Sequence, residues 1–252
     1  MVELKNLVEF LDNYLQINDI EDTCWNGLQV EGKKEVKKVL FAVDASISTF
    51  KKAVEEDADL IIVHHGHFWK SGNPSLVNWN KERIDLLYKK QISLYACHLP
   101  LDRHKEVGNN AQLLKLFNAK IKEEFLYHNG KNIGWIGELK TPLSVKDIEK
   151  KLNNELNTKS IVLPFGKEKI KTIAICSGGG DYAVFFEALN KKVDLYLTGD
   201  ASDIYSAAKD AKFNVIFAGH YATETIGVKA LSKIIKQKFK IETIFVDIKT
   251  GL

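Results

Sequence analysis

Leu60-Ile61-Ile62-Val63, followed at once by His64-His65, is the stretch that decides the fold of this 252-residue chain. A short apolar run rich in β-branched residues is typical of a strand that is buried on both faces, as strands in parallel sheets are. Such a strand needs helices on both sides of its sheet to cover it. The stretch therefore predicts an α/β fold, with two histidines where the strand ends.

The sequence on either side of this strand repeats the same alternation. Residues 4–15 have the apolar spacing of an amphipathic helix, and residues 36–43 read as a strand followed by a second helical pattern. After the central strand, a helix is expected at residues 81–90 and a strand at residues 92–97. Alternating strands and helices predict a mainly parallel sheet.

The alternation stops in the middle of the chain and then resumes. Residues 121–165 contain strand-like pieces and one helix that begins near Ser144, whereas further strands and helices alternate from residue 170 to residue 246. The fold class expected is two related α/β halves with mainly parallel sheets flanking a smaller α+β middle module. The expected boundaries are 1–128 for the first half, 129–166 for the middle module and 167–252 for the second half.

Composition narrows the class of protein. The net charge is only +3, and no basic stripe stands out, so nucleic-acid binding is possible but unsupported by charge. The three cysteines, Cys24, Cys97 and Cys176, form no CxxC pair, which argues against a disulfide framework or a thiolate zinc site. No apolar run approaches the ~18 residues of a membrane span, and no signal peptide is evident. We expect a cytoplasmic protein with no membrane association.

Histidines follow three of the predicted strands directly. His64 and His65 follow residues 60–63, His98 follows residues 92–97, and His220 follows residues 215–218 after a single glycine. In open α/β sheets, ligands bind outside the carboxyl ends of the strands. A lone histidine is more often a packing residue than a ligand, but three strands that each end in histidine favour a shared site.

Two of these histidines have a carboxylate four residues further on. These are His98 with Asp102 and His220 with Glu224. On a helix this spacing places both side chains on one face. Imidazole nitrogen and carboxylate oxygen are the ligands of zinc, iron and manganese. The sequence therefore predicts a metal site made of His64, His65, His98, Asp102, His220 and Glu224.

The adjacent pair His64-His65 argues for two ions, because successive side chains of an extended strand point in opposite directions. The alternative is a locally bent turn, which Gly66 would permit. Two divalent ions about 3.5–4 Å apart are typical of two-metal hydrolases. We therefore expect metal-activated water to attack a small-molecule substrate. One alternative is a non-catalytic metal-binding scaffold or regulator that interacts with protein or nucleic acid, although structural sites are usually closed by four ligands. Electron or oxygen chemistry at two irons is a third alternative.

Seven motifs that run over nearly the whole chain give it a family resemblance. They are Asn26–Gly32, His64–Lys70, His98–Asp102, Gly108–Gln112, Cys176–Gly180, Thr198–Asp200 and Gly219–Glu224. In these motifs the sequence resembles the Nif-three-like family, whose members are often labelled GTP cyclohydrolase 1 type 2 homologues. The metal ligands of that family fall on the same six residues that the spacing selects.

The resemblance implies more than the residues do. It implies a toroidal homohexamer whose metal sites face an inner cavity, and hydrolysis of a cyclic C–N bond in a nucleotide-like or lactam substrate. His67 departs from the aromatic residue that relatives often carry. We expect His67 to act in catalysis by transferring a proton beside the metal ligands. Asp200, at the end of another strand, is expected to orient a histidine.

Overall fold

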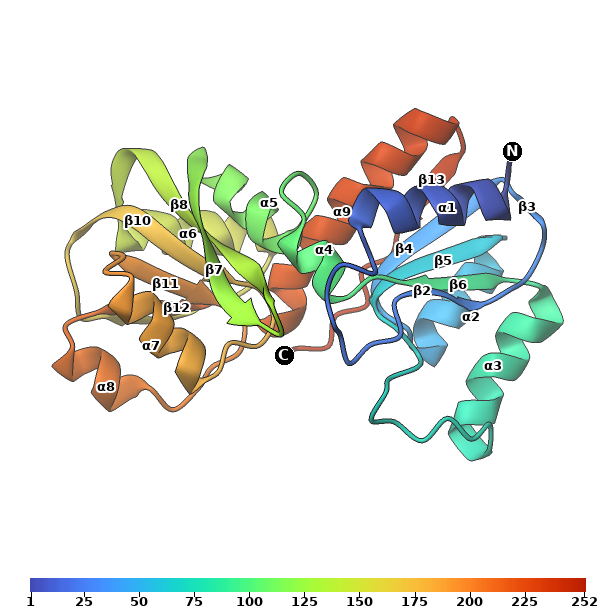
Figure 1. The fold of residues 1–252 in the computed structure, drawn as a ribbon, viewed down its shortest axis with the longest axis horizontal. Coiled ribbons are helices and arrows are strands. Elements are labelled where there is room, and N and C mark those ends of the chain that lie inside the picture. Colours follow the sequence, from blue (N-terminus) through green and yellow to red (C-terminus); the bar gives the residue numbers. More distant parts are fainter. The chain divides into compact units, whose positions relative to one another are not determined.

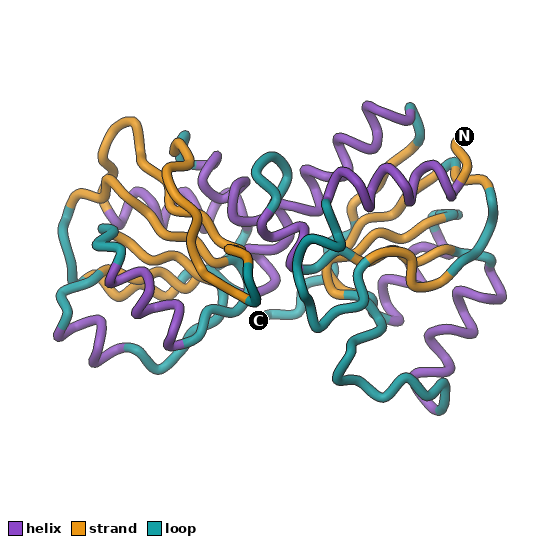
Figure 2. Tube along the Cα trace, viewed as in Figure 1, coloured by secondary structure: helices purple, strands orange, loops and turns teal.

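The computed structural model describes all 252 residues, which divide into two α/β units (Figure 1). Unit 1 comprises residues 1–101 and 228–248, and unit 2 comprises residues 102–227 and 249–252. The chain passes from one unit to the other within helix α4 (Leu99–Arg103) and again within helix α9 (His220–Phe239). Each unit has its own sheet with helices on both faces, as Figure 2 shows by colour.

The sheet of unit 1 has the strand order β13-β4-β5-β6-β2. Strands β13, β4, β5 and β6 are parallel, and β2 pairs with β6 in the antiparallel direction. A separate ribbon pairs β1 with β3. The strands of this unit are β1 (Val2–Glu3), β2 (Gly27–Val30), β3 (Glu35–Val36), β4 (Lys38–Asp44), β5 (Leu60–His65), β6 (Ser93–Ala96) and β13 (Glu242–Phe245).

Helices cover both faces of this sheet. Helix α1 (Leu4–Leu15) lies on one face, and α2 (Ile47–Glu55) and α3 (Asn78–Lys90) lie on the other (Figure 1). Ser46 caps α2 by accepting a hydrogen bond from the backbone N–H of Thr49, which starts the helix at the expected point. The apolar side chains of α2 and α3 form one buried cluster with alternate residues of β4, β5 and β6.

The sheet of unit 2 has the strand order β7-β8-β10-β11-β12-β9. Strands β10, β11 and β12 are parallel, and the other three are antiparallel to their neighbours. The strands of this unit are β7 (Ala119–His128), β8 (Lys131–Ser144), β9 (Ile161–Pro164), β10 (Lys169–Cys176), β11 (Leu195–Thr198) and β12 (Asn214–Phe217).

The helices of unit 2 likewise divide between two faces. Helices α5 (Asn109–Leu116) and α6 (Val145–Leu156) pack on one face, and α7 (Tyr182–Asn190) and α8 (Tyr205–Asp210) pack on the other. Ser144 caps α6 and Asp181 caps α7, each by accepting hydrogen bonds from backbone N–H groups of the first turn. None of the helices in either unit is both long and apolar enough to cross a membrane.

The two sheets confirm the two expected α/β halves, but no separate middle module lies between them, and the boundaries differ from those expected. Residues 129–166 do not form a module of their own, because β8 pairs with β10 and β9 pairs with β12 in the sheet of unit 2. The boundary expected near residue 128 lies instead near residue 101, and residues 228–248 return to unit 1. Antiparallel strands at the sides of a parallel core lack the alternation of strand and helix that marks the core in the sequence. The sequence pattern therefore assigns them to a separate module.

Candidate metal centre

Three histidine side chains converge at the carboxyl ends of β5 and β6 in unit 1. One ring nitrogen from each of His64, His65 and His98 lies within 4.8 Å of the others. The ring centroids are 4.7 Å apart for His64 and His65 and 5.1 Å apart for His64 and His98. Strand-end placement, which the sequence predicts, therefore brings these three imidazoles to one point.

His64 and His65 do not diverge as strand alternation predicts. The ladder between β5 and β6 ends at the pair Val63 and Ala96, one residue before His64. Strand β4 still pairs with β5 at Asp44 and His65, and both histidine rings lie close to the His98 ring, with centroids 5.1 and 5.6 Å from it. His64 is fully buried, whereas His65 and His98 are partly exposed.

Each of the three histidines has an acceptor at its Nδ1 atom. The pairs are His64 with the carbonyl oxygen of Cys97 at 2.9 Å, His65 with Asp44 Oδ1 at 2.8 Å, and His98 with Asp22 Oδ1 at 2.9 Å. A carbonyl oxygen or a carboxylate can only accept, so Nδ1 donates, and in the neutral imidazole Nε2 then carries the lone pair that can bind a metal ion. Histidines that bind metals in proteins are held in this way. The cluster therefore fits a divalent metal ion.

Asp22 is the most connected of these acceptors. Besides His98, its carboxylate accepts from the side chain of Asn26 and from the backbone N–H groups of Cys24 and Leu99. Burial alone would raise the pKa of Asp22, but the hydrogen bonds from His98, Asn26 and Cys24 outweigh burial and hold the pKa well below its usual range. Asp22 therefore stays ionised and fixes the orientation of the His98 ring.

The segment that follows His65 is fixed by Gln29 of β2. The side-chain oxygen of Gln29 accepts from the backbone N–H groups of His67 (2.7 Å) and Phe68 (3.2 Å). A Cβ atom at Gly66 would lie 2.4 Å from Gln29 Nε2, so glycine is needed for this close approach. The Trp69 ring, edge-on to His98 at 5.1 Å, covers the cluster from the same segment. The Asn26–Gly32 motif thus supports the histidines.

His67 is half-buried and does not belong to the histidine cluster. Its ring packs edge-on against Phe68. Burial, helped by the positive charge of Arg83, lowers the pKa of His67 to about 4. His67 is therefore a neutral imidazole at neutral pH.

In unit 2, His220 lies between two carboxylates. Its Nδ1 atom is 2.9 Å from Asp200 Oδ2, as expected for a residue that orients it, and its Nε2 atom is 3.2 Å from Glu224 Oε1. Hydrogen bonding to Glu224 is the largest effect on the pKa of His220, which rises to about 9 although burial opposes the rise. His220 and Glu224 lie one helical turn apart on α9. Imidazole and carboxylate are both side-chain types that bind divalent metals.

Gly178 leaves the space that His220 and Glu224 occupy. A Cβ atom at this position would lie 2.2 Å from Glu224 Oε1 and 3.1 Å from His220 Nε2, and its φ of +64° favours glycine. The backbone N–H of Gly178 donates to Thr223 Oγ1 at 2.9 Å. The glycine-rich loop after β10 therefore packs against the helix start of α9.

Asp102 is buried and is anchored to the same loop. Its Oδ1 atom accepts from Asn109 Nδ2 at 2.8 Å and from Ser177 Oγ at 2.9 Å. Asn110 donates to the backbone oxygen of Asp102 and accepts from the backbone N–H of Ser177. Asp102, His220 and Glu224 thus meet around the Ser177-Gly178 turn. The Gly108–Gln112 motif supplies the hydrogen bonds that orient Asp102.

Sequence reasoning missed the orienting residues of unit 1. Asp44 ends β4 just as His65 ends β5, so the rule that selected the histidines could also have selected Asp44. Asp22 lies in the loop between α1 and β2, where no periodicity marks it. Ser177, Asn109 and Asn110 fall inside motifs that carry the resemblance, but nothing in their spacing predicts contact with Asp102.

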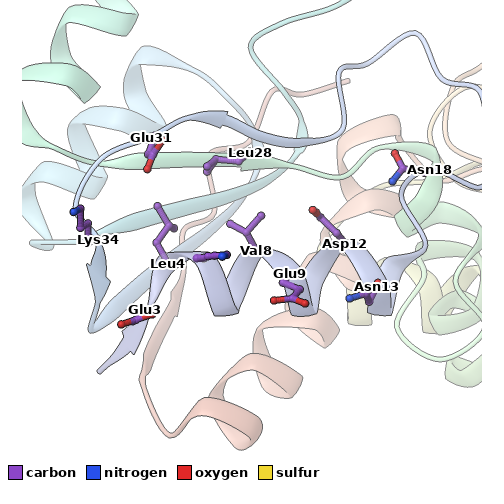
Figure 3. Close-up of a pocket in the computed structure, with 11 residues that line it drawn as sticks. Glu3, Leu4, Val8, Glu9, Asp12, Asn13, Asn18, Leu28, Glu31 and Lys34 are labelled. Atoms are coloured by element: carbon purple, nitrogen blue, oxygen red, sulfur yellow. The ribbon is translucent and has the colours of Figure 1, made fainter.

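A groove of about 910 Å³ lies elsewhere in unit 1, beside α1 (Figure 3). None of the six predicted ligands lines it. Asp12, on its wall, accepts a hydrogen bond from the Tyr95 hydroxyl at 2.8 Å, and burial raises the pKa of Asp12. The groove is lined by Glu3, Leu4, Lys5, Val8, Glu9, Asp12, Asn13, Asn18, Leu28, Glu31 and Lys34.

Comparisons with known proteins agree over the whole chain. The model of the family Duf34/NIF3 (NGG1p interacting factor 3) matches residues 2–251. A protein of Archaeoglobus fulgidus named GTP cyclohydrolase 1 type 2 homolog is 43% identical over 100% of both chains, and one of Pyrococcus horikoshii with the same name is 46% identical over 98% of both. A solved structure described as protein ybgI, of unknown function, has a TM-score of 0.92 and 33% identity over 100% of both chains.

Proposed function

The chain belongs to the Duf34/NIF3 family, and from this premise we propose that it is a metal-dependent hydrolase that holds two divalent ions, whether zinc, iron or manganese. Their ligands are His64, His65 and His98 of unit 1 together with Asp102, His220 and Glu224 of unit 2. The observation that carries the proposal is the convergence of three imidazole nitrogens within 4.8 Å of one another, each ring oriented through Nδ1.

The carboxylate ligands support two ions rather than one. Three imidazoles suffice for one ion with an open position, whereas Asp102 and Glu224 add two buried carboxylates. Two ions would polarise the bond under attack and activate water near neutral pH.

The protein's own residues have defined tasks in this reaction. The carboxylates of Asp22, Asp44 and Asp200 orient imidazoles, and Asn109 with Ser177 orients Asp102. We propose that His67 transfers a proton at its imidazole, because it follows the ligand His65 by only two residues in the chain.

The substrate class and assembly rest on the family. The relatives are named GTP cyclohydrolase 1 type 2 homolog. We propose that the chain opens a cyclic C–N bond in a nucleotide-like or lactam substrate. We propose a toroidal homohexamer in the cytoplasm as the working form. The rival function, a metal-binding scaffold without turnover, requires that protein ligands fill every coordination position.

Metal analysis beside activity tests the proposal. Full-length wild type, His98→Ala and Glu224→Ala are compared with His128→Ala, a histidine in the β7–β8 hairpin outside the ligand set. Metal content is measured by mass spectrometry, and hydrolysis of nucleotides and cyclic amides is followed on the same samples. We expect about two ions per chain in wild type and His128→Ala, with metal and activity lost together in the other two.

Full metal retention in His98→Ala and Glu224→Ala would overturn the ligand assignment. Normal metal content in wild type with no turnover of any candidate substrate would favour the scaffold instead.

A further inference from the structure

The groove beside α1 has a helix as one wall and a strand as the other (Figure 3). Leu4, Val8 and Asp12 of α1 line one side of it, and Leu28 of β2 lines the other. Its volume of about 910 Å³ lies within the range of ligand-binding sites in proteins. None of the six proposed metal ligands lines the groove, so a ligand bound there is independent of the proposed function.

Hydrogen bonds near both ends of the groove fix its walls. Near one end, the Asp12 carboxylate accepts a hydrogen bond at 2.8 Å from the hydroxyl of Tyr95, a buried residue of β6. Near the other end, the backbone N–H of Leu4 donates to the carbonyl oxygen of Lys34 at 2.7 Å. Helix α1 is thus anchored beside the sheet without a ligand. A groove formed in advance spares a ligand the cost of ordering it.

Strand β2 is an edge strand, and its outer edge is unpaired. It pairs with β6 on one side only, and no backbone group of residues 27–30 has a hydrogen-bond partner outside that pairing. Unpaired strand edges bind extended segments of other chains, which continue the sheet. The four residues of β2 span about 13 Å, and the part of α1 along the groove spans about 15 Å. The groove therefore matches an extended segment of about four residues in length.

The groove also carries an excess of negative charge. Four carboxylates and two ammonium groups line it, whereas the chain as a whole has a net charge of +3. The side chains of Glu9 and Glu31 are exposed, and neither forms an ion pair within the chain. Carboxylates without cationic partners at the rim of a groove favour a ligand that brings positive charge.

We propose that the groove between α1 and β2 binds an extended basic segment of a partner protein, which joins the free edge of β2 as an added strand. Backbone hydrogen bonds to residues 27–30 hold the segment in place. Its side chains point alternately to opposite faces. Apolar side chains on one face pack against Val8 and Leu28. Lysine or arginine side chains reach the carboxylates of Glu9 and Glu31.

Binding of designed peptides to the full-length protein tests the proposal. The probe is a labelled hexapeptide of alternating lysine and valine with blocked ends, and its affinity is measured by fluorescence anisotropy. One comparison peptide has glutamate in place of lysine, and another has N-methyl groups on alternate residues, which remove the donors of one strand edge. The protein variants are Glu9→Lys, Glu31→Lys and, as a control on an exposed position of α3, Glu82→Lys. Light scattering follows the oligomeric state of the same samples.

We expect wild type and Glu82→Lys to bind the lysine–valine peptide alike. N-methylation should weaken binding about tenfold or more, because two or more backbone hydrogen bonds are lost. Glu9→Lys and Glu31→Lys should each weaken binding by about three- to tenfold at low ionic strength, and the glutamate peptide should bind more weakly than the lysine peptide.

Three results would overturn the proposal. Equal binding of the N-methylated peptide would show that charge alone is recognised, without strand pairing. Absence of binding, or equal binding by the three glutamate variants, would remove the groove as the site. A change of oligomeric state when peptide is added would show that a second copy of the chain, and not another protein, occupies the groove.

Discussion

The two units are built from the same succession of elements. In unit 1 a helix and an antiparallel strand, α1 and β2, precede the parallel series β4-α2-β5-α3-β6. In unit 2, α6 and β9 precede the series β10-α7-β11-α8-β12 in the same way. In both series the antiparallel strand pairs with the last parallel strand. The same scaffold is thus used twice in one chain.

The two units differ in the side chains that follow the carboxyl ends of the matching strands. The last strand of each series is followed by a histidine and, four residues later, by a carboxylate. These are His98 and Asp102 after β6, and His220 and Glu224 after β12. The middle strand ends in His64-His65 in unit 1 but leads to Asp200 in unit 2. One unit therefore offers mainly imidazoles and the other mainly carboxylates, the two ligand types that divalent metals combine.

The carboxylates that orient histidines in the two units give the most sensitive test of this comparison. Asp22→Asn and Asp200→Asn each remove the charge that holds the Nδ1 atom of a histidine, His98 or His220. We expect metal affinity to fall by about 10–100-fold for each, since residues that orient ligands typically have effects of this size. The measurement is competition with a chromophoric chelator.

The two variants should not be equal. The Asp22 side chain is 2% exposed and also serves backbone N–H groups, whereas the Asp200 side chain is 48% exposed. Asp22→Asn is therefore expected to have the larger effect on metal affinity and on the free energy of unfolding. Equal effects, or none, would contradict the assigned roles.

A second matched pair tests stability at the opposite ends of the strands. Asp59 accepts from Lys33 Nζ and from the backbone N–H groups of Lys37 and Lys38. Asp194 accepts from corresponding groups, with Lys167 Nζ at 2.7 Å and the Lys171 and Thr172 N–H groups at 2.9 and 3.0 Å. We expect Asp59→Asn and Asp194→Asn each to lower the free energy of unfolding by about 1–2 kcal/mol at pH 7, measured by urea denaturation.

The pH dependence of this effect has a definite sign. Burial acts to raise the pKa of Asp59 and of Asp194, but the hydrogen bonds prevail and the folded-state pKa lies below the ordinary value. The stabilisation is therefore present above the unfolded-state pKa of about 3.9 and is lost as the pH falls through the folded-state value. The difference between variant and wild type should shrink below about pH 4. A difference that grows with acidification would refute this account.

Gly178→Ala is expected to have the smallest effect on stability and a specific effect on metal binding. The added Cβ displaces the buried Glu224 carboxylate, and the positive φ costs about 1 kcal/mol. Gly130→Ala is the control, because Gly130 also has a positive φ but its Cβ would meet nothing within 4 Å. Both variants should lose similar stability in a thermal melt. Only Gly178→Ala should bind metal more weakly, and equal metal binding in the two would contradict the placement of Glu224.

The sequence predicts the parallel core well because that core has local signatures. The buried strand at residues 60–63 and the helix over residues 4–15 both appear where apolar spacing predicts them, as β5 and α1. Strand β5 extends further, through both histidines. The boundaries of the units were not predicted, because β8 and β9 join their sheet by antiparallel pairing between segments far apart in the sequence.

The candidate ligands follow a local pattern in the sequence, whereas the residues that orient them do not. A ligand such as His98 comes two residues after the end of the buried strand β6, and this position is visible in the sequence. Asp22 reaches His98 from 76 residues away, and Ser177 reaches Asp102 from 75 residues away. These contacts depend on tertiary folding rather than on a local pattern.

We propose that the six candidate ligands hold two divalent ions close together. X-ray absorption spectroscopy of the full-length, metal-loaded protein tests it most directly. The account predicts imidazole scattering together with a metal–metal distance of about 3.5–4 Å, which disappears in His220→Ala. Mononuclear scattering in wild type, with no second metal in the neighbourhood of the first, would contradict it.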